Sequence, residues 1–124
     1  MKEEIVLEKT EVYFLGLTDD EFINEIPTLF RLLNEEKLEK TQALADCLLK
    51  FPTEMTPFIF EVFETNDFNV TMKEWSLDFI VPQLPFFVKI ALEDVLQRMA
   101  QSPSEEEKLA LLDEKANSVL SGFI

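Results

Sequence analysis

Paired carboxylates are the side chains of this sequence whose type and spacing suit chemistry. Acids four residues apart on expected helices are Glu21 and Glu25, Glu35 and Glu39, and Glu74 and Asp78. Neighbouring carboxylates can serve as general acid and general base, as they do in glycoside hydrolysis. That chemistry needs a deep, sugar-sized cleft, which thin helical layers built from 124 residues are not expected to frame. We therefore expect the protein not to be an enzyme.

The composition excludes most other common catalytic arrangements. The chain contains no histidine and two glycines, which excludes histidine-dependent triads, zinc–histidine sites and glycine-rich phosphate loops. Its single cysteine, Cys47, lies in an apolar helical stripe, and we interpret it as a small buried hydrophobe rather than a nucleophile. The segment 66–69 offers too few ligands in line for a calcium loop. The sequence thus predicts no catalytic residue, no metal and no cofactor.

The charge balance indicates the class of partner. There are 25 acids and 11 bases, a formal net charge of −14. Such a surface repels nucleic acid and anionic membranes at long range and attracts a basic protein, although acidity that serves solubility alone is the alternative. Neither a signal peptide nor an apolar run near the roughly 20 residues of a membrane span is evident. We expect a cytoplasmic protein with a basic protein partner, no nucleic acid, no membrane and no small-molecule substrate.

The elements that must position these acids are expected to be helices. Two glycines are too few for a fold of many short strands, and the length suits one domain over residues 1–124. Segment 1–17 should contain a short helix. Six more helices are expected over 18–34, 35–50, 56–64, 71–82, from 85 to the loop around Pro103, and 104–120. The signals are capping boxes at Thr18/Glu21, Thr71/Glu74 and Ser104/Glu107, a cap and first-turn proline at Thr56-Pro57, and a break or kink before Pro27.

Two of these helices recur as a unit. Residues 26–34 match residues 56–64 at an offset of 30, with Pro27 on Pro57, and residues 44–50 match 76–82, with Asp46 on Asp78. A more degenerate copy starts at Pro85. The repeat predicts an all-α, short solenoid of about seven helices stacked as antiparallel hairpins over residues 18–52, 53–84 and 85–121. Chance similarity of amphipathic helices is the alternative.

The segments IPTLFRLLN, TPFIFEVFETND, KEWSLDFIVPQLP and QSPSEEEKLALLDEKA carry a resemblance. In order and spacing over roughly residues 20–116, they resemble a family of small bacterial HEAT-like helical repeat proteins of unassigned function. The chain departs from that family at Glu35-Glu36-Lys37, where an aromatic is expected, and residues 1–17 have no counterpart. The resemblance implies a helical-repeat fold and brings no catalytic residues.

The second helices of the hairpins are expected to line one acidic, partner-binding face. Its candidate residues are Glu35, Glu36, Glu39, Asp46, Glu74, Trp75 and Asp78. Trp75 or Phe68 would be the aromatic anchor, with core packing as the favoured interpretation of Trp75. In the crowded stretch of residues 74–87, the residues expected in the core are Phe79, Ile80, Val81, Phe86 and Phe87.

Two functions fit such a face. A small acidic domain without catalytic equipment resembles, in kind, the immunity proteins that bacteria keep against toxins. It would be steered to a basic toxin, such as a nuclease, and cover its active site. The alternative is a HEAT-like adaptor or scaffold for another cytoplasmic protein.

Overall fold

The computed structural model describes residues 9–65 and 67–123, and within these ranges the protein is all-helical, with no strand. This confirms the all-α prediction. The described α-helices are α1 (Glu11–Leu15), α2 (Asp19–Asn34), α3 (Gln42–Leu49), α4 (Pro52–Glu64), α5 (Val70–Trp75), α6 (Phe86–Gln101), α7 (Glu105–Leu109) and α8 (Leu112–Ser121). A π-helical turn, η1 (Ser76–Ile80), and a 3-10 turn, η2 (Val81–Gln83), continue α5.

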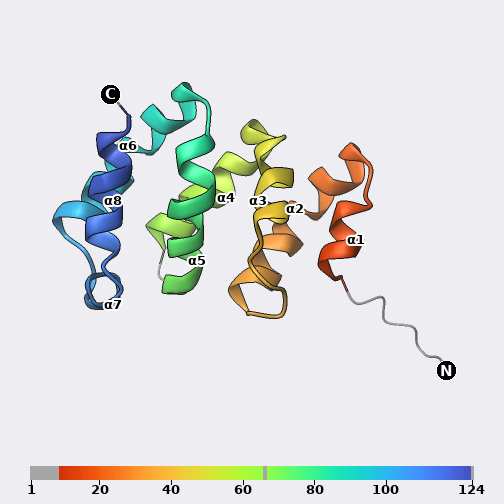
Figure 1. The fold of residues 1–124 in the computed structure, drawn as a ribbon, viewed down its shortest axis with the longest axis horizontal. Helices are drawn as coiled ribbons and strands as arrows, with labels where there is room; N and C mark the ends of the chain where they lie inside the picture. The colour runs from red at the N-terminus through yellow and green to blue at the C-terminus, as the bar shows by residue number, and fades with distance from the viewer. Residues whose placement is uncertain (1–8, 66, 124) are drawn as a thin grey trace.

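The helices form two rows that follow the chain along the long axis of the molecule (Figure 1). In one row α2 contacts α4 and α4 contacts α6; in the other α1 contacts α3, and η1 contacts both α3 and α8. The first turns of α2, α4 and α6 lie at the top of the view, which we call the upper edge (Figure 1). The connections after α2 and α6 lie at the opposite, lower edge (Figure 1).

The buried apolar side chains of both rows form one core. Leu29 of α2, Ile59 of α4 and Leu92 of α6 are fully buried in the same cluster as Leu48 of α3 and Leu77 of η1. Each helix contributes a stripe at a spacing of three or four residues, so an amphipathic helix buries one face against both neighbours.

The helix expected over residues 35–50 begins seven residues late, at Gln42. Residues after Asn34 turn away from the helix, and Glu36 adopts a left-handed conformation with φ 60°. The Thr41 side chain then accepts a hydrogen bond from Leu44 N and opens α3. Two of the acids assigned to this helix, Glu36 and Glu39, therefore lie in a connection, and Glu35 caps the end of α2.

The predicted helix start at Pro57 is wrong, and so is a break of the helix before Pro27, while the alternative of a kink there stays a prediction. Helix α4 begins at Pro52, with Phe51 at the N-cap, and it runs through Pro57. Helix α2 likewise continues through Pro27 without a break. Both interior prolines occupy exposed positions. There the carbonyl that loses its helical hydrogen-bond donor is open to water, which makes an interior proline tolerable.

Two of the three predicted capping boxes are confirmed. Thr18 and Ser104 each exchange side-chain and backbone hydrogen bonds with the glutamate three residues on. The box at Thr71 is wrong, because α5 starts at Val70 and the Asn69 side chain accepts from Met72 N at 2.9 Å. The final helix expected over 104–120 is two helices, separated at Leu111, whose φ is 60°.

The short helix expected in segment 1–17 corresponds to α1, which buries Phe14. Residues 1–8 lie outside the described part of the chain, so the prediction for them stays a prediction.

Candidate interaction surface

The junction between η1 and α6 shapes the upper edge. The buried Ser76 hydroxyl donates to Met72 O at 2.8 Å, and Val81 N donates to Ser76 O, five residues back. Pro82 has no N–H to continue the helix. The chain therefore passes through η2 into an extended Leu84, and α6 starts at Phe86 with Pro85 at its N-cap.

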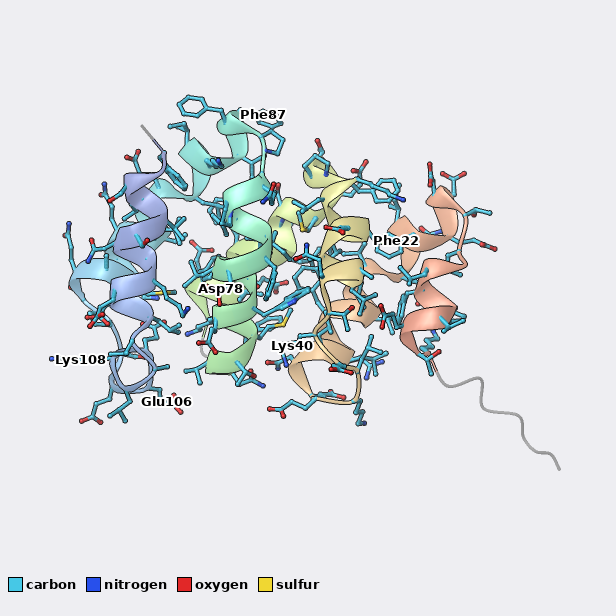
Figure 2. The ribbon with its side chains drawn as sticks, viewed as in Figure 1. Phe22, Lys40, Asp78, Phe87, Glu106 and Lys108 are labelled. Carbon is cyan, nitrogen blue, oxygen red and sulfur yellow. The ribbon has the colours of Figure 1, made fainter. Side chains whose placement is uncertain are left out.

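The first turn of α6 exposes an apolar patch, defined as Phe86, Phe87 and Ile90. Their exposed fractions are 63%, 66% and 47%. Figure 2 shows Phe87 at the upper edge, with its ring beyond the helices. The buried stripe of α6 runs through Val88 and Leu92, so the patch residues lie off the face that meets the core.

The expectation that the aromatics of residues 74–87 are all core residues is thus wrong. Phe86 and Phe87 belong to the exposed patch, and Phe79 of η1 is 38% exposed. Ile80 and Val81 are buried as expected.

A hollow of about 210 Å³ lies between α6, η2 and the end of α8. Pro82, Lys89, Val119 and Phe123 are among its lining residues. Lys89 Nζ lies 5.8 Å from the centre of the Phe123 ring. The lysine is therefore engaged with an aromatic ring at this site.

Acidic side chains stand at the same edge. Asp19 and Asp20 occupy the first turn of α2, and Glu54 occupies the first turn of α4. All three are exposed, and none has an ion-pair partner among the described residues. A helix N-terminus stabilises a carboxylate, so these charges are retained at low cost to the fold.

The candidate acids Asp46, Glu74 and Asp78 lie on α3, α5 and η1, respectively. Asp46 is exposed on α3, where Gln42 Nε2 donates to its Oδ1 at 2.8 Å. Lys115 of α8 lies 3.1 Å from Asp78 Oδ1 and 3.9 Å from Glu74 Oε2. One lysine therefore partly neutralises the pair that the sequence singles out for acid–base chemistry.

The other candidate acids lie at the lower edge, in the connection after α2. Glu35 pairs with Arg31 and Lys37, each at 3.4 Å. Glu36 and Glu39 line a shallow hollow of about 480 Å³ together with Lys37, Leu38 and Lys40.

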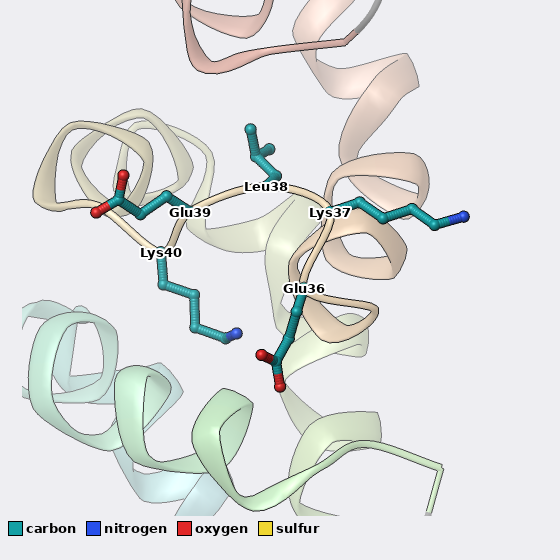
Figure 3. Close-up of a pocket in the computed structure, with 5 residues that line it drawn as sticks. All are labelled: Glu36, Lys37, Leu38, Glu39 and Lys40. Carbon is teal, nitrogen blue, oxygen red and sulfur yellow. The ribbon is translucent and has the colours of Figure 1, made fainter.

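The side chains of this hollow diverge. In Figure 3, Lys37 and Glu39 point to opposite sides of the loop, and Leu38 points away from Glu36 and Lys40. Burial lowers the pKa of Lys40, and the nearby Glu36 carboxylate acts in the opposite direction. The hollow thus holds two acids and two bases that do not converge on one point, which is unlike a catalytic pocket.

Trp75 is 4% exposed, which confirms the core interpretation of this residue and removes it from the surface. Its indole N–H has no hydrogen-bond partner among the residues that the structure describes, and neither has the buried Oδ1 of Asp113 on α8. Phe68, the other aromatic considered, is half-buried and packs against the core.

A buried ion cluster connects α5, α6 and α7, and sequence reasoning missed it. Lys73 Nζ lies 2.8 Å from Glu107 Oε2, and Arg98 Nη1 lies 2.7 Å from Glu107 Oε1. Arg98 also donates to Phe63 O at 3.0 Å, and Ser104 N donates to Glu107 Oε1 at 2.8 Å. The signal in the sequence was the Ser104/Glu107 box alone, which does not reveal that the same carboxylate is buried.

The contacts of this ion cluster indicate a structural role. Burial would raise the pKa of Glu107, but hydrogen bonds from Arg98, Lys73 and Ser104 outweigh it and lower the pKa to about 2. The carboxylate therefore stays ionised and fully occupied by donors, with no free lone pair directed at a surface hollow.

The remaining chemical candidates give no site among the described residues. Burial raises the pKa of the Cys47 thiol, which disfavours the thiolate that a nucleophile requires. No group of three or more metal-ligating side chains occurs in the described ranges. Within the same ranges, no helix has the length and apolar content to cross a membrane.

Comparison with known proteins identifies a family. The profile of a domain of unknown function, DUF5071, matches residues 8–120, most of the chain. No curated protein and no solved structure matches the chain significantly.

Proposed function

Since the chain belongs to the DUF5071 family, which has no assigned function, we propose a function from its own surface: a non-enzymatic, acidic domain that binds a basic protein. The observation that supports this most is the row of α2, α4 and α6. Its exposed carboxylates without an ion-pair partner among the described residues are Asp19, Asp20, Glu21, Glu54, Glu61, Glu64 and Asp94. Carboxylates left unpaired on three neighbouring helices of one row favour a partner that supplies the opposite charge.

The proposal includes the repeat architecture. We propose that the two rows form a short HEAT-like solenoid, which presents broad faces rather than a deep pocket. Burial at two matched pairs of repeat positions supports this: Leu44 and Leu48 of α3 are buried, as are Ser76 and Ile80 of η1. Asp46 and Asp78 are exposed at equivalent positions.

Within this class, we propose an immunity protein that binds a basic toxin, such as a nuclease, in the cytoplasm and covers its active site. The net charge of −14 would steer such a complex together, and steering falls as salt screens the charges.

An adaptor or scaffold for another protein is the second candidate. The exposed Phe86 and Phe87 favour it, because an apolar contact would hold a partner whatever the salt concentration. The two candidates therefore differ in how ionic strength acts on association.

The test is affinity capture with the full chain at low salt, followed by measurement of the association rate with the captured protein. For the toxin inhibitor, the captured protein is basic, its co-expression with this chain restores growth, and the association rate falls about tenfold or more between about 0.05 and 0.5 M salt. A rate that is insensitive to salt, with no effect on growth, favours the adaptor. Capture of an acidic partner would contradict the proposed basic partner, and with it the toxin inhibitor.

A further inference from the structure

The apolar patch on α6 is unusual in its position. Single exposed apolar residues are normal on protein surfaces, but Phe86, Phe87 and Ile90 fall within two turns of one helix. Phe86 and Ile90 are four residues apart and Phe87 and Ile90 are three apart, so the three share one side of α6. No described element covers them, since Phe86 and Phe87 remain about two-thirds exposed.

The upper edge on which the patch lies also carries acidic side chains. The first turns of α2, α4 and α6 all lie at the upper edge, and α4 contacts both α2 and α6 (Figure 1). Glu54 lies in the first turn of α4, the helix next to α6, whereas Asp19 and Asp20 lie farther along the same edge, in the first turn of α2 beyond α4 (Figure 1). Two bases are also near: Lys50, the C-cap of α3, and Lys89, which lies over the Phe123 ring.

We infer that the upper edge is a docking surface for an amphipathic basic helix of a partner protein. Apolar side chains of that helix would pack on Phe86, Phe87 and Ile90, and its lysines or arginines would face Asp19, Asp20 and Glu54. Charge complementarity selects this occupant, because the exposed acids disfavour an acidic segment and an anionic lipid surface. An apolar stripe with anchors three and four residues apart is the form in which an amphipathic helix fits such a patch.

This inference rests on the proposed basic partner and adds the place and the form of its contact. It moves the expected contact away from Glu35, Glu36 and Glu39, which lie at the lower edge. It also gives the aromatic anchor to Phe86 and Phe87 in place of the buried Trp75.

The probe is a labelled synthetic helix of leucine and lysine with all leucines on one face, titrated with the full-length protein and followed by fluorescence anisotropy. One control peptide has the same composition in scrambled order, and the other has glutamate in place of every lysine. We expect the amphipathic basic helix to bind at least about tenfold more tightly than either control.

Matched variants locate the contact. Phe86→Ser with Phe87→Ser should weaken binding about tenfold or more, whereas Leu109→Ser with Leu111→Ser should not, although those leucines are 84% and 54% exposed near the lower edge. Asp19→Asn with Asp20→Asn should weaken binding about threefold to tenfold, most strongly at low salt. The control is Glu105→Gln with Glu106→Gln, since these acids occupy the same first two positions of α7 behind an equivalent capping box.

The outcomes separate the inference from the function on which it rests. Equal binding of the amphipathic and scrambled peptides, or equal loss in the upper-edge and lower-edge variants, overturns the docking surface. A dimer in sedimentation that dissociates on Phe86→Ser with Phe87→Ser would assign the patch to a second copy and also overturn it. In either case, salt-dependent capture of a basic protein would leave the proposed function standing.

Discussion

Lys73 Nζ lies 2.8 Å from Glu107 Oε2, although the two residues are 34 positions apart and both side chains are buried. Arg98 completes the cluster and ties it to Phe63 O of α4. A short helix, α7, is thereby joined to α5 and α6 through one carboxylate, and Arg98 extends the connection to α4. The contacts of Glu107 therefore link helices at the C-terminal end of both rows.

Glu107→Gln should lower the free energy of unfolding by about 3–5 kcal/mol, because it leaves the buried Lys73 ammonium without its counter-charge. Urea unfolding followed by circular dichroism measures the loss. Glu106→Gln, an exposed neighbour in the same turn, is the control and should change stability by less than about 0.5 kcal/mol. If Glu107→Gln lowers the free energy of unfolding by less than about 1 kcal/mol, the ion cluster does not stabilise the fold as proposed.

Acid should remove the contribution of Glu107. Its pKa in the folded protein is about 2, below the ordinary 4.5, so the folded state binds its proton less readily than the unfolded chain. The stability from this group is complete above about pH 4.5 and is lost as pH falls toward about 2.

The measurement is the urea midpoint of the wild type and of Glu107→Gln between about pH 6 and 2. The difference in urea midpoint between the wild type and Glu107→Gln should become smaller as pH falls through that range. Glu25, whose pKa is lowered by the Tyr13 hydroxyl, contributes in the same direction in both proteins, so it cancels from the comparison. A gap that is constant with pH would contradict the assignment.

Asn69→Ala should destabilise the protein by about 1–2 kcal/mol. Its side chain caps α5 and donates to Asn34 O at 2.6 Å, while its backbone N donates to Asn34 Oδ1 at 2.8 Å. If Thr71 were the N-cap, Thr71→Ala would cost as much. Because Asn69 is the cap, we expect Thr71→Ala to change stability by less than about 0.5 kcal/mol. Thermal or urea unfolding of the two variants decides between the caps, and a larger loss for Thr71→Ala would reverse the assignment.

Pro57→Ala should raise stability by about 1–2 kcal/mol, because it restores a hydrogen bond inside α4, partly offset by a more flexible unfolded chain. Pro52→Ala is the matched control: at the first position of the same helix no bond is restored, so stability should not rise. Urea midpoints measure both. Destabilisation by Pro57→Ala would indicate that α4 begins at Pro57 after all.

Local signals in the sequence determined a large part of this fold. The capping boxes at Thr18 and Ser104 were predicted correctly because all their atoms lie within four consecutive residues. The amphipathic stripes and the scarcity of glycine predicted an all-α chain, and the absence of histidine narrowed its chemistry. The charge of −14 indicated a class of partner, which stays a prediction.

Tertiary packing decided between helix starts and caps that the local sequence favours equally. Pro52 and Pro57 both suit a helix start, and α4 begins at the first, which allows Met55 to be fully buried as part of the helix. Thr71 and Asn69 both suit a cap, and the hydrogen bonds from Asn69 to Asn34 favour Asn69.

The candidate surface shows the same division. The sequence identified Asp46, Glu74 and Asp78 as exposed acids on neighbouring helices, but it could not separate them from Glu35, Glu36 and Glu39, which a turn carries to the lower edge. Phe86 and Phe87 looked like core residues, since side-chain type sets how much burial would stabilise them and not whether a neighbour is present to bury them. Whether an aromatic is core or contact surface depends on atoms supplied by distant helices, and only the assembled rows decide that.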